Sequence, residues 1–317
     1  MGSTLGVYLT MKWLPAKQMT LRPSTWDGYR RLIELHVLPH LGRAPLRHLR
    51  AEHLDRLYAT LLERGRCDGN GGLDIKTVHE VHIVIRRALR DAERRGSIVR
   101  NPAELAHAPK RRPLSSGEFR AWNADQLGKF LNLAQNNTHF APLWLAANTG
   151  MRRGEVLGMR WSDVDLEWAR LSVNRSLVSV AYELHESRGK TRTARRTVDI
   201  DERTVNVLGT IRSTDPDGEA YVSCHKDGSP IHPQVLSDAF KRLVTQSRLP
   251  RIRLHDLRHT HATLLLKAGV PIKVVSERLG HSTPGFTMAT YQHVLPGMQA
   301  EAARTFAALL ERPMSFV

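Results

Sequence analysis

Residues 254–294 (LHDLRHTHATLLLKAGVPIKVVSERLGHSTPGFTMATYQHV) concentrate side chains that could act on a phosphate. His255 and Arg258 are three positions apart, so on a helix they share a face and form an anion site with one titratable donor and one permanent charge. His281 follows in the phrase Leu-Gly-His-Ser, and Tyr291 lies ten residues further on. A tyrosine has a pKa of about 10, so it is a nucleophile near neutral pH only where cations stabilise its phenolate.

Two basic residues elsewhere in the chain have the same potential. Arg152 follows Thr-Gly-Met at a predicted helix start, where free backbone N–H groups favour anions, and Glu155 is spaced to orient its guanidinium. Lys190 lies between two predicted strands in ESRGKTRTARRTVDI, at a hairpin tip that could reach a phosphate. Taken singly, these residues also fit ordinary roles: a solvated basic surface for the charged side chains, and half-buried packing for Tyr291.

The joint pattern resembles the tyrosine recombinase family, the integrases of phages and integrative elements. Order and spacing agree with that family over nearly the whole chain. The motifs that carry the resemblance are Thr149-Gly150-Met151-Arg152 with Glu155 and Arg160-Trp161-Ser162-Asp163; Lys190-Thr191 followed by Arg195-Arg196-Thr197-Val198; His255-Asp256-Leu257-Arg258-His259-Thr260; Leu279-Gly280-His281-Ser282; and Tyr291 followed by His293. Near the N-terminus, the residues similar to the family's core-binding domain are Ser24-Thr25-Trp26, Tyr29 and Asn101-Pro102.

The resemblance assigns three residues to a scissile phosphate and a fourth to their support. Arg152 and Arg258 would grip it, and His281 would hydrogen-bond to it. Glu155 occupies the acidic supporting position, where we expect a structural role. Negative charge grows on the non-bridging oxygens during attack, and arginine and histidine donors stabilise that charge as metal ions do in other phosphoryl-transfer enzymes. We therefore expect no cofactor and no bound metal ion, and activity that persists in EDTA.

The resemblance assigns the bond-making and bond-breaking steps to three further residues. Tyr291 would be the nucleophile, His255 a general acid/base near it, and Lys190 the acid that protonates the departing 5′ oxygen. A covalent 3′-phosphotyrosyl intermediate keeps a phosphoester bond, so strands are rejoined without ATP or a ligase. The implied function is site-specific DNA recombination that integrates or excises a mobile element, either a phage or an integrative element.

The cysteine and histidine content bears on metal sites and on the compartment. Several histidines near the C-terminus raise the possibility of a metal site, but no HExxH motif and no nearby acidic cluster accompany them. Cys67 and Cys224 are too few for a disulfide framework or a four-cysteine zinc site. No apolar run approaches the roughly 18–20 residues that span a membrane, and no secretory signal is visible. These features favour a bacterial cytoplasm and no membrane partner.

The net charge indicates a polyanionic partner. The 317 residues include 47 Lys and Arg against 31 Asp and Glu, a formal net charge of +16. The excess is densest in residues 1–112, which hold 21 basic and 11 acidic residues. Arginine, the main contributor, binds phosphate through bidentate hydrogen bonds. A soluble basic protein without such a partner is the alternative on charge alone; together with the resemblance, the charge predicts double-stranded DNA attachment sites as the partner.

The predicted fold has two domains joined by a basic linker. Residues 1–107 are predicted to form an all-α core DNA-binding domain of four helices, the second of them capped by Ser24. Residues 108–119 form the linker, because proline, serine, glycine and a basic cluster show no periodicity there. Residues 120–317 form a mainly α-helical catalytic domain. The four N-terminal helices are expected near residues 4–14, 24–42, 51–65 and 76–95.

The catalytic domain is also predicted to hold a small three-stranded antiparallel sheet. Apolar residues alternate between about 170 and 200, which is typical of strands. The three strands are expected at residues 171–173, 178–184 and 197–200. Helices are expected on both sides of this segment, the first capped by Asn123 and the last near residues 296–311.

The resemblance implies an assembly on DNA. The two domains would close around the duplex as a C-shaped clamp, and a tetramer would form on two DNA sites, with the helix near 296–311 docking on a neighbour. An accessory directionality factor or a host DNA-bending protein is a further expected partner. Many such integrases carry another N-terminal domain for arm sites; the core-binding match begins within the first few residues here, so arm-site binding is not expected.

Two other functions stay open from the sequence. Residues 255–281 resemble two helices joined by a Gly-containing turn, as in non-catalytic helix-turn-helix regulators, although that leaves Arg152, Lys190 and Tyr291 without roles. A topoisomerase-like DNA-relaxing enzyme would use the same tyrosine. A regulator would be insensitive to Tyr291→Phe, and a relaxing enzyme would act on plasmids that carry no specific site.

Overall fold

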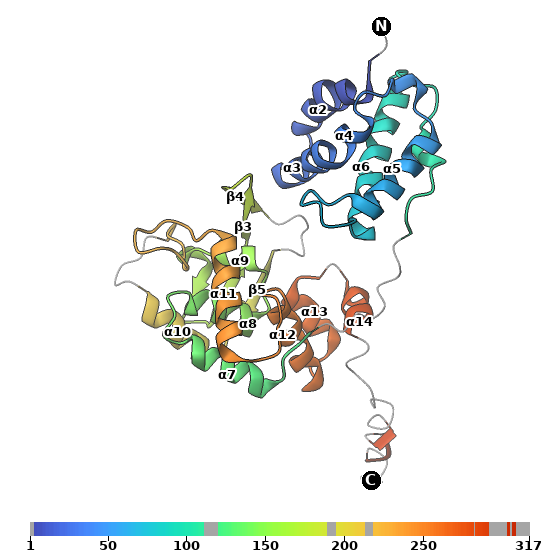
Figure 1. Ribbon diagram of the computed structural model, residues 1–317. Coiled ribbons are helices and arrows are strands. Elements are labelled where there is room, and N and C mark those ends of the chain that lie inside the picture. The colour runs from blue at the N-terminus through green and yellow to red at the C-terminus, as the bar shows by residue number, and fades with distance from the viewer. Residues whose placement is uncertain are drawn as a thin grey trace, which may run out of the picture. The chain divides into compact units, whose positions relative to one another are not determined.

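The fold is that of a computed structural model, drawn with labelled elements in Figure 1. The described residues are 3–110, 120–188, 195–212, 218–281, 283–291, 303–304 and 306–308. The chain divides into two compact units, and each is considered by itself. Lys190 lies outside the described residues, as do most of the expected linker and most of the helix expected at 296–311.

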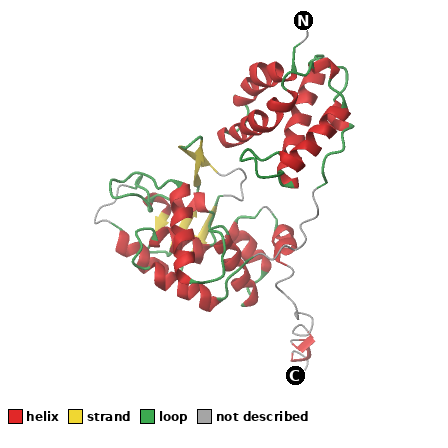
Figure 2. Ribbon diagram, viewed as in Figure 1, coloured by secondary structure: helices red, strands yellow, loops and turns green. Residues whose placement is uncertain are grey.

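The first unit is helical (Figure 2). Its π-helical segments η1 and η2 continue directly into the α-helices on either side, so the four long helical segments predicted from the sequence are confirmed. The elements are α1 (Leu5–Val7), η1 (Tyr8–Trp13), α2 (Leu14–Gln18), α3 (Pro23–Leu32), η2 (Ile33–Val37), α4 (Leu38–Leu41), η3 (Leu46–His48), α5 (Ala51–Arg64), α6 (Ile75–Arg94) and η4 (Pro102–Glu104).

The second of these segments begins differently from the prediction. Its first residue is Pro23, and Arg22 rather than Ser24 is the N-cap. Proline fixes φ near the helical value, and its missing N–H costs nothing at a first helical position. The cap predicted at Ser24 is therefore wrong.

The core of the first unit is tied to α6 by aromatic side chains. The hydroxyl of Tyr8 donates to the carbonyl of Ala88 at 3.0 Å, and Nε1 of Trp13 donates to Asp91 at 2.8 Å. Both rings are buried, and their polar tips need partners because an unpaired buried donor is costly. These bonds fix the first helical segment against α6.

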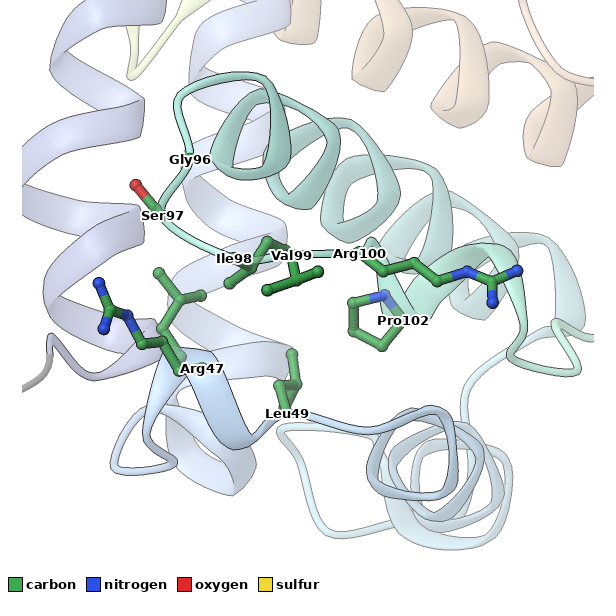
Figure 3. A pocket seen from close by; sticks show the side chains of 9 residues that line it. Arg47, Leu49, Gly96, Ser97, Ile98, Val99, Arg100 and Pro102 are labelled. Atoms are coloured by element: carbon green, nitrogen blue, oxygen red, sulfur yellow. The ribbon is translucent and has the colours of Figure 1, made fainter.

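A hollow of about 360 Å³ lies between η3 and the residues that follow α6. Figure 3 shows Arg47 and Arg100 on opposite sides of the apolar Ile98, Val99 and Pro102. None of the residues predicted to act on a phosphate lines this hollow. Those that the structure describes belong to the second unit, where the candidate site is therefore found.

The second unit is mainly helical. Its predicted cap at Asn123 is confirmed: the side chain accepts from the backbone N–H of Gln126, and the Gln126 side chain accepts from the N–H of Asn123. The helices are α7 (Ala124–Ala134), α8 (Phe140–Thr149), α9 (Arg153–Leu157), η5 (Trp161–Asp163), α10 (Glu202–Ile211), α11 (Pro233–Ser247), α12 (Asp256–Lys267), α13 (Ile272–Leu279) and α14 (Pro284–Tyr291). No helix in the described part of the chain is both long and apolar enough to cross a bilayer.

The antiparallel sheet of three strands is present, but one strand differs from the prediction. The sheet has the order β1-β2-β5, made of β1 (Val164–Asp165), β2 (Arg170–Val173) and β5 (Arg196–Asp199). In its centre Leu171 pairs with Val198, and both side chains are buried. The strand expected at 178–184 is instead a two-stranded pair, β3 (Arg175–Val180) and β4 (Glu183–Arg188).

A tight turn explains this correction. Ala181 and Tyr182 have φ values of 49° and 68°, the left-handed conformation that a two-residue type I′ hairpin turn requires. Neither residue is the glycine or asparagine that usually marks such a turn. Because a two-residue turn leaves the period-two pattern unbroken, the alternation alone reads as one continuous strand.

The helix α12 connects the main core to the last helices, since it packs against both α8 and α13. We expect Leu257→Ala in α12 to lower the free energy of unfolding by ~2–5 kcal/mol, because loss of the buried side chain would leave a cavity. Leu133→Ala, at an exposed position of α7, is the matched control and should change it by less than about 0.5 kcal/mol. Urea unfolding followed by circular dichroism measures both; equal effects would contradict this account of the core.

Candidate active site

Arg258 lies in the first turn of α12 and has only 3% of its surface exposed. Its Nη1 donates to the carbonyl of Gly150 and its Nη2 to the carbonyl of Leu279, both at 2.7 Å. Gly150 ends α8 with a φ of 66°, and a Cβ there would come within 2.7 Å of the Leu279 side chain. The Thr-Gly-Met-Arg motif thus supplies a turn that needs glycine and that Arg258 can reach.

The C-terminal end of α13 collects three guanidinium groups. The carbonyls of residues 278–280 each accept a hydrogen bond from a different side chain: Arg196 Nε at 2.7 Å, Arg258 Nη2 at 2.7 Å and Arg152 Nη2 at 3.4 Å. The last carbonyls of a helix lack partners within it and carry the negative end of its dipole, so cations are stabilised there. We call these three residues the arginine cluster. His281 follows directly, so the same bonds fix its position.

Glu155 links two members of the arginine cluster. Its Oε1 accepts from Arg152 Nη1 at 2.8 Å and from Arg196 Nη1 at 3.2 Å, while its Oε2 accepts from the Arg152 backbone N–H and from Arg196 Nη2, both at 2.9 Å. Arg152 is the N-cap of α9, as the sequence predicted. Burial alone would raise the pKa of Glu155, but hydrogen bonding and attraction from Arg196, then Arg152, hold it below its usual range.

The cluster has a solvent-facing member and buried ones. The side chain of Arg152 is 42% exposed, whereas that of Arg196 is 7% exposed. Burial, followed by repulsion from Arg152, lowers the pKa of Arg258 to about 9, so this side chain stays charged at pH 7. The arrangement is a cationic site in which the guanidinium of Arg152 is accessible to an anion, while Arg196 and Arg258 are buried.

Besides burial, the positive charges of Arg258 and Arg152 help to lower the pKa values of His281 and His255. Nδ1 of His281 hydrogen-bonds to Oγ1 of Thr287 in α14 at 2.7 Å. Burial, then Arg258 and Arg152, lowers the pKa of His281 to about 4, and burial followed by Arg258 also lowers the pKa of His255. Both imidazoles are therefore neutral at pH 7, so each has one N–H donor and one acceptor nitrogen.

Tyr291 lies at the end of α14 with 1% of its surface exposed. Its hydroxyl is 2.8 Å from Nδ1 of His259, whose ring stands edge-on to His255 with centroids 5.3 Å apart. Burial raises the pKa of Tyr291 to about 12, although the charge of Arg258 opposes this. The phenol is thus neutral and covered by protein here, and one histidine lies between it and His255.

Three residues that contact the site were not assigned to it from the sequence. His259 has a detectable signal, because it is one helical turn after His255 on α12. Arg196 shares a strand face with the buried Val198, and a charge on an inward face requires a buried counter-ion. Arg278 has no such signal in the sequence. Its Nη1 donates to the carbonyl of Asp199 at 2.8 Å, and this contact depends on how α13 packs against β5.

The structure thus brings six of the seven predicted residues together around α12 and the end of α13. Arg152, Glu155, Arg258 and His281 surround the end of α13, and Tyr291 reaches α12 through His259. His255 is the N-cap of α12 and is within electrostatic range of Arg152 and Arg258. Lys190 lies outside the described residues. Within the described residues, no group of three or more His, Cys, Asp or Glu side chains could hold a metal ion.

Comparison with known proteins shows the family of the chain. The profile described as "Phage integrase family" matches residues 120–297, more than half of the chain. The chain belongs to the phage integrase family of tyrosine recombinases. A second profile, "Phage integrase, N-terminal SAM-like domain", matches residues 7–62 of this recombinase. The predicted family and the predicted enzyme class, a tyrosine site-specific recombinase, are confirmed.

Relatives align along most of the recombinase. It is 25% identical to the "Tyrosine recombinase XerC-like" protein of Caldanaerobacter subterraneus subsp. tengcongensis, over 95% of this chain and 82% of that protein. It is 24% identical to the ICEBs1 integrase of Bacillus subtilis, over 94% of this chain and 81% of the relative. Both units of the recombinase therefore have counterparts in these relatives.

Solved structures share the fold of the recombinase. The Tn1549 transposon integrase, solved with a circular intermediate DNA, matches 92% of this chain and 98% of its own with a TM-score of 0.73 and 21% identity. A lambda integrase tetramer bound to a Holliday junction matches 91% of this chain and 77% of its own with a TM-score of 0.67 and 19% identity. The predicted fold class is confirmed by these likenesses.

The histidines predict how stability depends on pH. The pKa values of His259 and His281 fall to about 4 and that of His261 to about 3, all mainly through burial, whereas an unfolded histidine has a pKa of about 6.5. Between these values the unfolded chain binds more protons, so stability is full above about pH 6.5 and is lost as pH falls toward 4. Melting temperatures from pH 7.5 to 4.5 should fall steadily.

A variant isolates the contribution of one ring. His259→Asn keeps a polar group near Tyr291 but removes a titrating group, so its melting temperature should depend less steeply on pH than that of the wild type. A melting temperature that stays constant through this window would contradict the burial of neutral histidines.

Proposed function

We propose that this recombinase cuts and rejoins double-stranded DNA at attachment sites through a covalent 3′-phosphotyrosyl intermediate, and thereby integrates or excises a mobile element. The observation that carries the proposal is the convergence of Arg152 and Arg258, which donate to the carbonyls of adjacent residues at the end of α13. Two guanidiniums at one place form a receptor for a phosphate. Relatives named integrases support the mobile element as the substrate.

The arginines act by stabilising charge. Attack on a phosphodiester increases the negative charge on its non-bridging oxygens, and donors already in position stabilise that charge without reorganising. Arg152 offers an exposed guanidinium, and Arg258 adds a fixed positive charge behind it. His281 is neutral, and the ring nitrogen that is not bonded to Thr287 contributes a hydrogen bond to a non-bridging oxygen.

Tyr291 is the proposed nucleophile. Its Oη forms a bond to phosphorus while the bond from phosphorus to the 5′ oxygen breaks, and the leaving oxygen takes a proton to become a 5′ hydroxyl. His255 takes the phenolic proton, and we assign protonation of the 5′ oxygen to Lys190. Rejoining reverses these steps: a 5′ hydroxyl attacks the phosphotyrosine, and Tyr291 recovers its proton. The phosphoester bond is conserved throughout, so no ATP is needed.

The partners follow from the reaction. Exchange between two DNA sites requires several protomers on the DNA, and a lambda integrase of the same fold was solved as a tetramer bound to a Holliday junction. We therefore propose a tetramer in the synaptic complex, assisted by an accessory directionality factor or a host DNA-bending protein. The net charge of +16 supplies the long-range attraction to DNA.

Tyr291→Phe tests the nucleophile. The variant should bind attachment-site DNA as tightly as the wild type but form no covalent adduct with a nicked suicide substrate, because the attacking oxygen is absent. Denaturing gels that resolve the protein–DNA adduct make the measurement. Tyr182→Phe, at an exposed turn, is the control and should form the adduct normally.

Three outcomes would contradict the proposal. Adduct formation by Tyr291→Phe would assign the nucleophile to another residue. A wild-type protein that binds attachment-site DNA but forms no adduct would favour a helix-turn-helix regulator. Relaxation of plasmids that lack an attachment site would favour a topoisomerase-like enzyme.

Arg152→Gln tests the phosphate receptor. Glu155 keeps Arg196 as its partner in this variant, so the local fold should survive. We expect the cleavage rate at saturating DNA to fall by roughly 10²–10³-fold, the usual effect of losing one donor that stabilises transition-state charge. Arg170→Gln, at an exposed position of strand β2, is the control. Equal cleavage rates in Arg152→Gln and the wild type would remove Arg152 from the reaction.

A further inference from the structure

Arg196 is a buried arginine that shares the carboxylate of Glu155 with Arg152. It is the first residue of β5, and its guanidinium faces the second unit's interior. Nη1 and Nη2 donate to the two carboxylate oxygens of Glu155, and Nε donates to the carbonyl of Arg278. All three nitrogens of this buried guanidinium thus donate hydrogen bonds to other residues of the protein.

Glu155 divides its charge between two cations. Each of its oxygens accepts one bond from Arg196, and Oε1 also accepts from the guanidinium of Arg152. The trio of one carboxylate and two guanidiniums carries a net positive charge of one. Arg196 is the buried cation of the trio and Arg152 the exposed one, so the surplus positive charge is available at the solvent-facing side.

We infer that Arg196 is a positioning residue that neutralises Glu155 and so leaves the charge of Arg152 free for the scissile phosphate. Arg196 acts through Glu155 and does not itself touch DNA. The inference rests on the phosphate-binding role proposed above for Arg152.

The physical reason lies in the cost of a buried carboxylate. Without Arg196, the Glu155 carboxylate would be buried with Arg152 as its remaining hydrogen-bonded cation. A buried charge that loses one partner holds the other more tightly, because its lost hydration is not replaced. Arg152 would then form a neutral pair with Glu155, and its pull on a phosphate would weaken.

A second contact must be separated from this effect. The bond from Arg196 Nε to the Arg278 carbonyl also anchors α13, so loss of Arg196 could act by displacing His281. Neutralising Glu155 distinguishes the two. Glu155→Gln removes the charge that would capture Arg152, but it does not restore the bond to α13.

The test is a set of four full-length proteins: wild type, Arg196→Met, Glu155→Gln, and the double variant Arg196→Met/Glu155→Gln. Single-turnover cleavage of a suicide attachment-site substrate at saturating protein gives the rate, and titration gives the Kd for DNA. We expect Arg196→Met to slow cleavage roughly 10- to 100-fold, the range of coupling between residues in one charged network. The Kd should change less than the rate.

The double variant decides the mechanism. It has neither the carboxylate charge nor its missing partner, so it should cleave faster than Arg196→Met alone and recover most of the rate. A double variant as slow as Arg196→Met, or slower, would overturn the inference and assign Arg196 to anchoring α13. A wild-type rate in Arg196→Met would overturn it as well.

The pH profile gives a second readout that a purely structural role would not move. The charged groups around Glu155 are Arg152 from α9, Arg196 from β5 and, at longer range, Arg258 from α12. In Arg196→Met the carboxylate loses a cation and becomes easier to protonate, and protonation releases Arg152. The rate of Arg196→Met relative to wild type should therefore rise as pH falls from about 7.5 to 5.5. In the double variant this ratio should be flat; a flat ratio in Arg196→Met would contradict the inference.

Two controls address folding and charge. Arg170→Met removes an arginine from the neighbouring strand β2 whose partner, Asp199 at 3.0 Å, is exposed, and it should cleave within about twofold of wild type because such pairs contribute little. Arg196→Lys keeps the cation beside Glu155. If Arg196→Met proves unfolded by circular dichroism, Arg196→Lys carries the test: cleavage within a few-fold of wild type supports the inference, and cleavage as slow as in Arg152→Gln overturns it.

The outcomes also separate this inference from the proposed function. If Arg152→Gln cleaves normally, the role of Arg152 fails and the inference fails with it. If Arg152→Gln is inactive while Arg196→Met cleaves at the wild-type rate, the inference fails alone.

Discussion

The hydrogen bonds at the C-terminal end of α13 satisfy the last carbonyls of the helix and also position the arginines of the candidate site. Three carbonyls without helical partners need donors, and three buried or half-buried guanidiniums need acceptors. These arginines come from the start of α9, from β5 and from α12, so one set of hydrogen bonds joins segments far apart in the chain. His281 follows the same helix end and is positioned by it. The proposed phosphate receptor therefore depends on a single piece of backbone.

Collecting cations has an electrostatic cost, and the site offsets it in two ways. Glu155 accepts hydrogen bonds from two of the arginines and stays ionised despite burial. The histidines respond by remaining neutral, since burial and the arginine charges lower the pKa of His259 and His281 to about 4. A neutral imidazole donates one hydrogen bond and accepts another without adding to the repulsion. Charge is thereby concentrated on the arginines, where a phosphate would meet it.

Tyr291 is inert in this structure. Arg258 favours its phenolate, but burial outweighs that attraction and raises the pKa to about 12. The hydroxyl is occupied by His259, a residue of the same helix that carries Arg258. The helix α12 thus contacts the proposed nucleophile and supplies a proposed phosphate ligand. A neutral, covered phenol does not attack the phosphorus of DNA, which suits an enzyme whose unwanted reaction would be a permanent strand break.

The sequence by itself determined the helices and the family, and it supplied the residues proposed for the site. Helical periodicity and caps such as Asn123 act between residues a few positions apart, so the sequence alone predicts them. The strand expected at 178–184 fails for the same local reason, because a two-residue turn preserves the alternation. Only the tertiary structure decided that Arg196 reaches Glu155 and that Tyr291 meets His259. Such contacts join residues separated by 41 and 32 positions, and they are set by packing rather than by local preference.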